Sequence, residues 1–134
     1  MKFPANDRTP LIRTDFSDDA AWHRIVEAAS ASSPDGFRAN LHVVDDRSFE
    51  KAAPSDLSAD AGGHHHLLII ADGEAMRDPE MALLCVDPGH PGQRFRVIPA
   101  QLWGVENNVS LANMDFDEFT GAVDPDGVFR GFRD

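Results

Sequence analysis

The chain has 134 residues, 42% of them hydrophobic and 26% charged, which suits one domain with its own core and differs from the composition of disordered chains. Its formal net charge of −11 disfavours nucleic-acid binding through a basic face, because neutralising phosphates requires clustered Lys and Arg. Its apolar runs are too short to span a bilayer, its first residues lack the hydrophobic core of a signal peptide, and its single cysteine excludes an internal disulfide. We therefore expect a cytoplasmic protein with no membrane role.

The first part of the chain predicts a strand, a helix and a second strand. Residues 1–9 are polar and contain proline, so we expect a flexible tail before a single domain over residues 10–134. A short strand over 11–14 leads to a helix with Ser17 as its N-cap, whose apolar face is spaced i, i+3, i+4, i+7. The residues of that face are Trp22, Ile25, Val26 and Ala29. The second strand covers residues 41–44.

The longest apolar run, residues 67–71, predicts the central strand of the sheet. It lies between Gly62-Gly63 and Asp72-Gly73, and its lack of polar alternation indicates that both faces are covered. The succession of strands and helices up to this point predicts right-handed crossovers and three parallel strands. The order of these strands cannot be inferred from the sequence.

The next two strands are predicted over residues 83–86 and 94–98. The link 73–82 has a length that suits either a crossover or a hairpin, so the direction of the strand at 83–86 stays open. The strand at 94–98 should be antiparallel to it and should lie at the sheet edge, because its arginines alternate with apolar residues. We therefore expect an α/β or α+β fold, with a mixed, mainly parallel sheet of about five strands and helices packed on it.

The last third of the chain predicts two helices and a turn. Pro99 can open a helix that Asn107-Asn108 would end, while residues 109–113 suit either a frayed helix or a short strand. Residues 115–118 resemble a capping box, with Asp in the cap position and Glu three residues later. Residues 124–127 have the preferences of a type I turn.

Several segments are similar to those of a family of small uncharacterised actinobacterial proteins. The resemblance covers most of the chain but implies no activity, ligand or catalytic residue. Its segments are Leu11-Ile12-Arg13-Thr14-Asp15-Phe16, Phe95-Arg96-Val97-Ile98-Pro99-Ala100-Gln101-Leu102-Trp103, Glu106-Asn107-Asn108, Ala112-Asn113-Met114-Asp115-Phe116 and Asp126-Gly127-Val128-Phe129-Arg130-Gly131-Phe132.

Four aspartates follow the strands that we predict to be parallel, and they suggest a metal site. Asp15, Asp45, Asp46 and Asp72 should all lie at the carboxyl edge of the sheet, where open α/β sheets bind ligands. Carboxylates gathered there could hold Mg²⁺ for an enzyme acting on a phosphorylated substrate. The spacing matches neither a response-regulator receiver nor a haloacid-dehalogenase phosphatase. The alternative is that each Asp ends a strand or caps a helix.

The histidines suggest a second possible metal site, and the cysteine suggests none. His64 and His66 point the same way on a strand and could share Zn²⁺ with His42 if its strand is adjacent, at the edge opposite Asp72. The alternative is that they are exposed residues at a strand end. Cys85 lies among apolar neighbours, which indicates a buried and inert thiol.

A polar stretch rich in amides is the third candidate site. Amide groups both donate and accept hydrogen bonds, and a nearby aromatic ring can anchor a partner. Local capping at helix ends is the alternative. The residues that we select are Trp103, Glu106, Asn107, Asn108, Asn113 and Asp115.

The sequence contains none of the familiar nucleotide-binding, phosphate-loop, zinc-protease or nucleophile-elbow motifs. Our leading hypothesis is a non-catalytic acidic binding domain, of the kind that inhibits or gives immunity against a basic protein. The competing hypothesis is a metal-dependent enzyme that uses the aspartate edge. We assign no cofactor, and the oligomeric state is not predicted.

Overall fold

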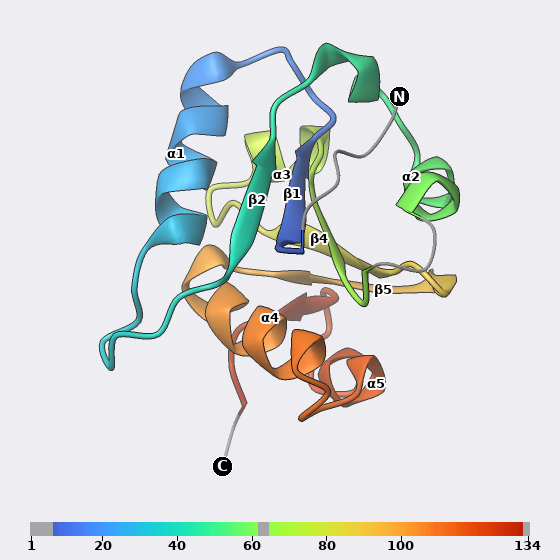
Figure 1. Cartoon of the computed structure of the whole chain (residues 1–134). Helices are drawn as coiled ribbons and strands as arrows, with labels where there is room; N and C mark the ends of the chain where they lie inside the picture. Colours follow the sequence, from blue (N-terminus) through green and yellow to red (C-terminus); the bar gives the residue numbers. More distant parts are fainter. Residues whose placement is uncertain (1–6, 62–64, 133–134) are drawn as a thin grey trace.

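Six strands form one sheet in the computed structural model, which describes residues 7–61 and 65–132 (Figure 1). Their order is β2-β1-β3-β4-β5-β6; β1 is parallel to β2 and β3, β4 is antiparallel to both neighbours, and β6 is parallel to β5. The fold is α/β as predicted, but the sheet is mixed rather than mainly parallel. The strands are β1 (Thr9–Arg13), β2 (Leu41–Val44), β3 (Leu68–Ala71), β4 (Leu83–Asp87), β5 (His90–Val97) and β6 (Val128–Phe129).

The central position of β3 is confirmed. It lies between β1 and β4, and all four of its side chains are buried. Each Leu or Ile side chain fully buried in this way stabilises the fold by about 1.5–3 kcal/mol. The three parallel strands are confirmed as well, and the strand whose direction the sequence left open, β4, returns antiparallel to β3 after the short helix α3 (Gly73–Arg77).

The predicted edge position of β5 is wrong. Residues 128–129 pair with Arg96 and Val97, so β6 forms that edge of the sheet and β2 forms the other. A strand of two residues shows no alternation in the sequence, which explains why β6 was not predicted. The alternation within β5 is nevertheless correct, since Phe95 and Val97 are buried while Arg94 is exposed.

Helix α1 (Asp19–Ser30) has the predicted buried face, but its cap lies one residue later than predicted. Asp18 is the N-cap, and its carboxylate accepts a hydrogen bond from the Ala21 N–H at 3.0 Å. Ser17 lies before the cap, and its hydroxyl and its N–H both donate to the carboxylate of Asp15. The helix buries Ala21, Trp22, Ile25 and Ala29.

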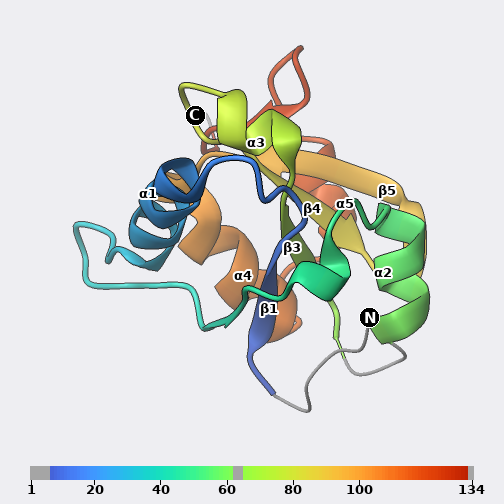
Figure 2. The same ribbon diagram turned by 90° about the horizontal axis from the view of Figure 1, so that it is seen from above.

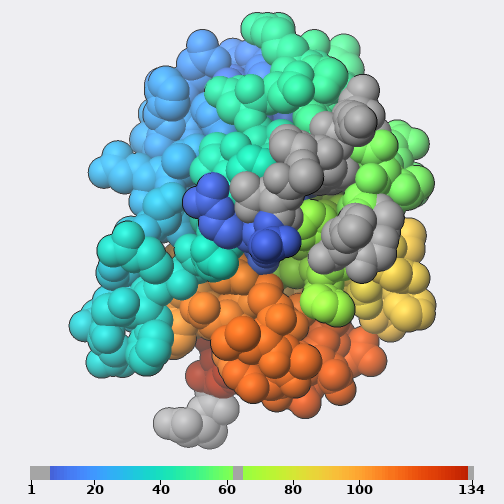
Figure 3. All heavy atoms as spheres, viewed as in Figure 1, coloured from blue at the N-terminus to red at the C-terminus, as the bar shows by residue number. Residues whose placement is uncertain are grey.

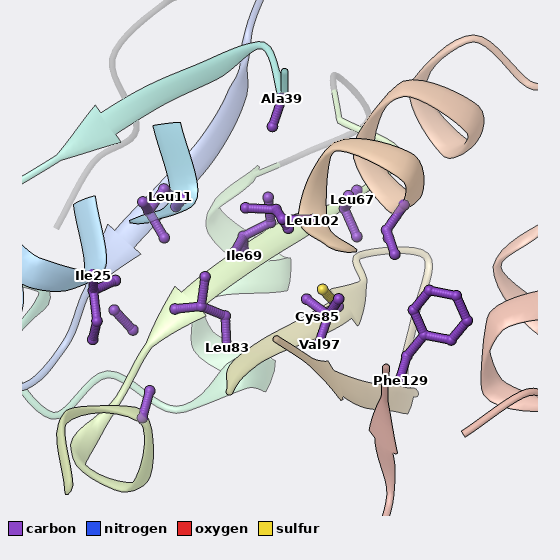
Figure 4. Packing of buried hydrophobic residues seen from close by; sticks show 14 of the residues in the cluster. Leu11, Ile25, Ala39, Leu67, Ile69, Leu83, Cys85, Val97, Leu102 and Phe129 are labelled. Carbon is purple, nitrogen blue, oxygen red and sulfur yellow. The ribbon is translucent and has the colours of Figure 1, made fainter. Parts of the chain in front are cut away.

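The sheet separates two hydrophobic cores (Figure 2). Side chains of α1, α3, α4 (Leu102–Ser110) and α5 (Phe116–Thr120) pack on one face, and Phe49 of η1 (Arg47–Phe49) and α2 (Pro54–Ala61) pack on the other. Figure 4 shows Cys85 within the first core, beside Val97. Burial raises the pKa of its thiol, as expected for an unreactive side chain.

Helix α4 continues past the predicted end at Asn107-Asn108 to Ser110, after the 3-10 turn η2 (Pro99–Gln101). The amides of Asn107 and Asn108 donate to the carbonyl groups of Trp103 and Gly104, one turn earlier, at 2.7 Å each. These bonds keep both side chains inside the helical geometry instead of ending it. The ambiguous residues 109–113 are therefore the last turn of α4 and the turn after it, where Ala112 has φ of 57°.

Helix α5 begins at the predicted cap, although the capping box itself is absent. The carboxylate of Asp115 makes no capping hydrogen bond; its backbone carbonyl accepts from the Glu118 N–H at 3.1 Å. The predicted turn over 124–127 is present, with a bond of 2.8 Å from the Gly127 N–H to the Asp124 carbonyl. Within residues 7–61 and 65–132, none of the helices combines the length and apolar character needed to cross a membrane.

Candidate functional site

The carboxyl edge of β1, β2 and β3 is organised around a buried arginine that the sequence analysis missed. Arg13 is only 3% exposed, and its guanidinium lies 4.4 Å from the centre of the Phe16 ring and 5.5 Å from that of Trp22. Its Nη2 donates to Asp19 at 2.6 Å, and its Nε donates to the carbonyl of Asp15 at 3.0 Å. The sequence did contain a signal for its burial: Arg13 lies two residues after the core residue Leu11 in the strand, so the two side chains share a face of the sheet.

The predicted aspartates lie at this edge, but each has a partner in the protein. Asp15 accepts from Ser17, Asp45 lies 3.4 Å from Arg13 Nη1, and Asp46 caps η1 through the Ser48 N–H. Hydrogen bonds from Ser17 and Ser48 hold the pKa values of Asp15 and Asp46 below their usual range, and Arg13 does the same for the pKa of Asp19. The hydrogen bonds from Ser17, Arg13 and Ser48 therefore stabilise the anionic forms of Asp15, Asp19 and Asp46 from within the chain.

The fourth predicted aspartate, Asp72, joins the loop after β3 to the end of β5. Its carboxylate caps α3 by accepting from the Ala75 N–H, and it receives two hydrogen bonds from Arg96, at 2.9 Å and 2.6 Å. Arg96 also pairs with Glu74 and donates to the carbonyl of Ala82. Among the described residues, no group of three or more His, Cys, Asp or Glu side chains is placed to hold a metal ion.

The predicted histidine site lies partly outside the described residues, because His64 does. His42 is half-buried on β2, and His66 is exposed just before β3. Neither belongs to a group of three metal-binding side chains within residues 7–61 and 65–132.

Glu106, from the predicted amide-rich stretch, lies inside the molecule at the opposite edge of the sheet. It is 2% exposed, and its carboxylate accepts from the hydroxyls of Thr9 and Ser110 at 2.9 Å and 2.6 Å and from the N–H of Asn40 at 2.6 Å. A charged group buried this deeply needs several donors, and the chain supplies three. Glu106 therefore ties α4 to the beginnings of β1 and β2.

Trp103 and Asn107 hold the loop before β2 against α4. The rings of Trp103 and Phe37 stack with centroids 5.3 Å apart, and the Asn107 amide donates to the Arg38 carbonyl at 3.1 Å. Phe37 remains 54% exposed. Trp103, Asn107 and Leu111 follow one another at intervals of four residues, so they share one side of the helix.

The outer side of α4 and the start of α5 form the remaining candidate, which we call the α4–α5 surface. It combines exposed apolar, amide and acidic side chains, and Figure 3 shows these helices at the lower front of the molecule beside the loop before β2. Asn113 and Asp115 are exposed here, whereas Glu106, Asn107 and Asn108 bond within the chain. The surface consists of Phe37, Trp103, Leu111, Asn113, Asp115, Asp117 and Glu118.

Comparison with family models gives one match, which covers residues 8–132. The matching family is described as a domain of unknown function, DUF6924. The match extends from the residue before β1 to beyond β6, so it includes the whole sheet. Comparison with curated proteins finds no significant match. The resemblance to an uncharacterised family is thereby confirmed, and any function has to be argued from the geometry.

Proposed function

We propose that this chain, which belongs to the DUF6924 family, is a non-catalytic binding domain whose α4–α5 surface docks a basic protein. An inhibitor or immunity-type role would use such a surface to cover the partner's cationic site. The observation that carries the proposal is the charge of one continuous segment. No Lys, Arg or His occurs between Val97 and Phe129, and Asp115, Asp117 and Glu118 are exposed within it.

These three carboxylates differ from Asp124 and Asp126, the other two aspartates of the segment, because the protein does not neutralise them. They form no ion pair among the described residues, whereas Asp124 and Asp126, in the same segment, both pair with Arg130. Unpaired charges of one sign raise the association rate with an oppositely charged protein and contribute specificity. A partner with clustered Lys or Arg is therefore the chemistry that this surface fits.

Exposed apolar groups on the same surface supply anchors for a partner. Leu111 is 69% exposed at the end of α4, and Phe37 is 54% exposed against Trp103. Aromatic side chains such as Phe37 and Trp103 are enriched in protein interfaces, and an exposed Leu beside them adds apolar contact area. The loop that presents Phe37 is already ordered, since Ser33 Oγ accepts from the Phe37 N–H and its own N–H donates to the Phe37 carbonyl.

Affinity capture from a lysate of the source cells, followed by mass spectrometry, tests the proposal with two matched variants. The first neutralises the surface by Asp115→Asn, Asp117→Asn and Glu118→Gln. The second removes the same charge elsewhere by Asp7→Asn, Glu27→Gln and Glu50→Gln, which are exposed. A basic protein should bind the wild type and the second variant but not the first, and raising salt from about 0.05 M to about 0.3 M should weaken that binding.

A second readout separates apolar anchoring from charge alone. Leu111→Ser should leave the free energy of unfolding within about 0.5 kcal/mol of wild type, because the residue is exposed, yet it should weaken capture of the same protein. Equal capture by the wild type and the surface-neutralised variant would contradict the proposal.

A further inference from the structure

A second site lies on the opposite side of the sheet from α1, as an open cleft of about 480 Å³. Its floor is a row of side chains that are in register across three strands, Leu84 of β4, Arg96 of β5 and Val128 of β6. One wall is the end of α3 and the other is the turn before β6, which lie next to each other at the top of Figure 2. Clefts of this volume, with a partly apolar lining and a few charged groups, are typical of small-molecule sites.

Most charged groups in this cleft already have partners. Every nitrogen of the Arg96 guanidinium bonds or pairs with Asp72, Glu74 or the Ala82 carbonyl. Asp126 pairs with Arg130, and Asp78 accepts from the N–H groups of Glu80 and Ala82. Among the described residues that line the cleft, Arg77 is the charged one whose side chain forms neither a hydrogen bond nor an ion pair.

The position of Arg77 depends on the absence of a side chain at Gly73, one helical turn earlier. A Cβ at residue 73 would lie 2.9 Å from Arg77 Nη1 and 2.8 Å from Asp15 Oδ2, so only glycine leaves both groups where they are. The carboxylate of Asp15 is already held by Ser17, and it keeps the Arg77 guanidinium close without forming an ion pair with it. Arg77 lines the cleft, and its guanidinium, next to Gly73, keeps donors to spare.

We propose that this cleft binds a small organic anion, with Arg77 holding the anionic head and Leu84 and Val128 contacting an apolar body. A carboxylate and a phosphate monoester share the required chemistry, because both accept two parallel hydrogen bonds from a guanidinium. The apolar floor requires a body of a few carbons rather than a bare inorganic ion. The site is separate from the α4–α5 surface, so it does not depend on the function proposed above.

Calorimetric titration of the full chain with four probes tests this assignment. The probes are 4-methylpentanoate, isopentyl phosphate, isopentanol and inorganic phosphate. At least one of the first two should bind, with a dissociation constant in the millimolar range or below, while isopentanol and inorganic phosphate should bind more weakly by about tenfold or more. The better of the two organic anions identifies the head group.

Two arginine variants locate the binding. Arg77→Gln should weaken binding of the organic anion by about tenfold or more, because a charge-assisted hydrogen-bonded pair is lost. Arg94→Gln, which removes an exposed arginine of β5 that does not line the cleft, should leave affinity unchanged, as should the variant neutralised at the α4–α5 surface. No binding of either organic anion, binding of isopentanol as strong as theirs, or full binding by Arg77→Gln would each overturn the proposal.

Discussion

Two regions of this molecule are rich in carboxylates, but those of one region have partners within the protein and those of the other do not. At the carboxyl edge of β1, β2 and β3, carboxylates are hydrogen-bonded or paired with Arg13 and Arg96 and hold the sheet and its loops together. On the α4–α5 surface, Asp115, Asp117 and Glu118 are exposed without such partners among the described residues. A count of acidic residues therefore predicts neither a metal site nor a docking surface; the pairing of each carboxylate decides between a structural and a binding role.

The largest effect expected from this comparison is the loss of Arg13. Arg13→Ala removes the packing of the arginine stem against Phe16 and Trp22 and the hydrogen bonds to the residues around it, at a cost of about 2–4 kcal/mol in the free energy of unfolding. Urea denaturation measures this. Asp117→Asn, on the other surface, should change stability by less than about 0.5 kcal/mol, and equal losses for the two variants would contradict the contrast.

Glu106 tests the same contrast within one helix, because it lies on the buried side of α4 while the α4–α5 surface includes the outer side. Glu106→Leu keeps much of the volume but removes both acceptor oxygens, so the Asn40 N–H and the hydroxyls of Thr9 and Ser110 lose their acceptor, at a cost of about 1–3 kcal/mol. Urea denaturation again gives the value. Because this side chain is internal, capture of the basic partner by the folded variant should equal that of the wild type. Weaker capture by a variant with the wild-type free energy of unfolding would instead show that Glu106 contributes to partner binding.

Acid should lower the stability of the fold through the paired region. The pKa values of Asp15, Asp19 and Asp46 are lowered in the folded state by hydrogen bonds from Ser17, Arg13 and Ser48. A lowered folded pKa means that the contribution is present above the unfolded value of about 3.9 and is lost as pH falls through the folded pKa. The free energy of unfolding measured from neutral pH downward should therefore fall below about pH 4, with a shallower slope in Asp19→Asn.

A smaller effect is expected at the junction of α4 and α5. Ala112 has φ of 57°, a left-handed conformation that costs an L-residue about 1–2 kcal/mol, while glycine adopts it freely but loses more entropy on folding. Ala112→Gly should therefore raise the free energy of unfolding, by about 0.5 kcal/mol, measured by thermal and urea unfolding. Ala100→Gly, at an exposed position in η2, is the matched control and should be destabilising.

The smallest expected effect is that of divalent metals. Since the edge carboxylates bond within the chain, Mg²⁺, Mn²⁺ and Zn²⁺ at millimolar concentration should leave the melting temperature of the full chain unchanged. A rise that disappears in Asp15→Asn or Asp72→Asn would instead support a metal-dependent enzyme at this edge.

The sequence predicts local structure well here, because the signals are local. The uninterrupted run ending at Ala71 predicts the buried strand β3, and the spacing of Trp22 and Ile25 predicts the inner face of α1. The Asp and Gly of residues 124–127 likewise predict their turn. In each case the residues that determine the structure are neighbours in the chain.

The partners of the polar side chains could not be predicted, since they are distant in the sequence. Asp72 and Arg96 are 24 residues apart, and Thr9 and Glu106 are 97 apart. Alternation shows that Arg96 lies on the face of β5 opposite Phe95, but only the strand order brings it over Asp72. The candidate residues of α4 differ in the same way, because only one side of this helix is buried. Glu106 lies on the buried side and Asn107 on the outer side, and a list of polar residues does not show which is which.

The hydrogen bonds that Glu106 accepts from Thr9 and Asn40 also affect how the chain folds during its synthesis. During synthesis, the hydroxyl of Thr9 and the N–H of Asn40 emerge from the ribosome long before the carboxylate that accepts from them. Closing a loop of this span is slow and entropically costly, so the start of β1 should gain its native protection only when the chain through α4 is free to fold. Chains released early, before α4, would expose that end of the sheet to chaperones and proteases.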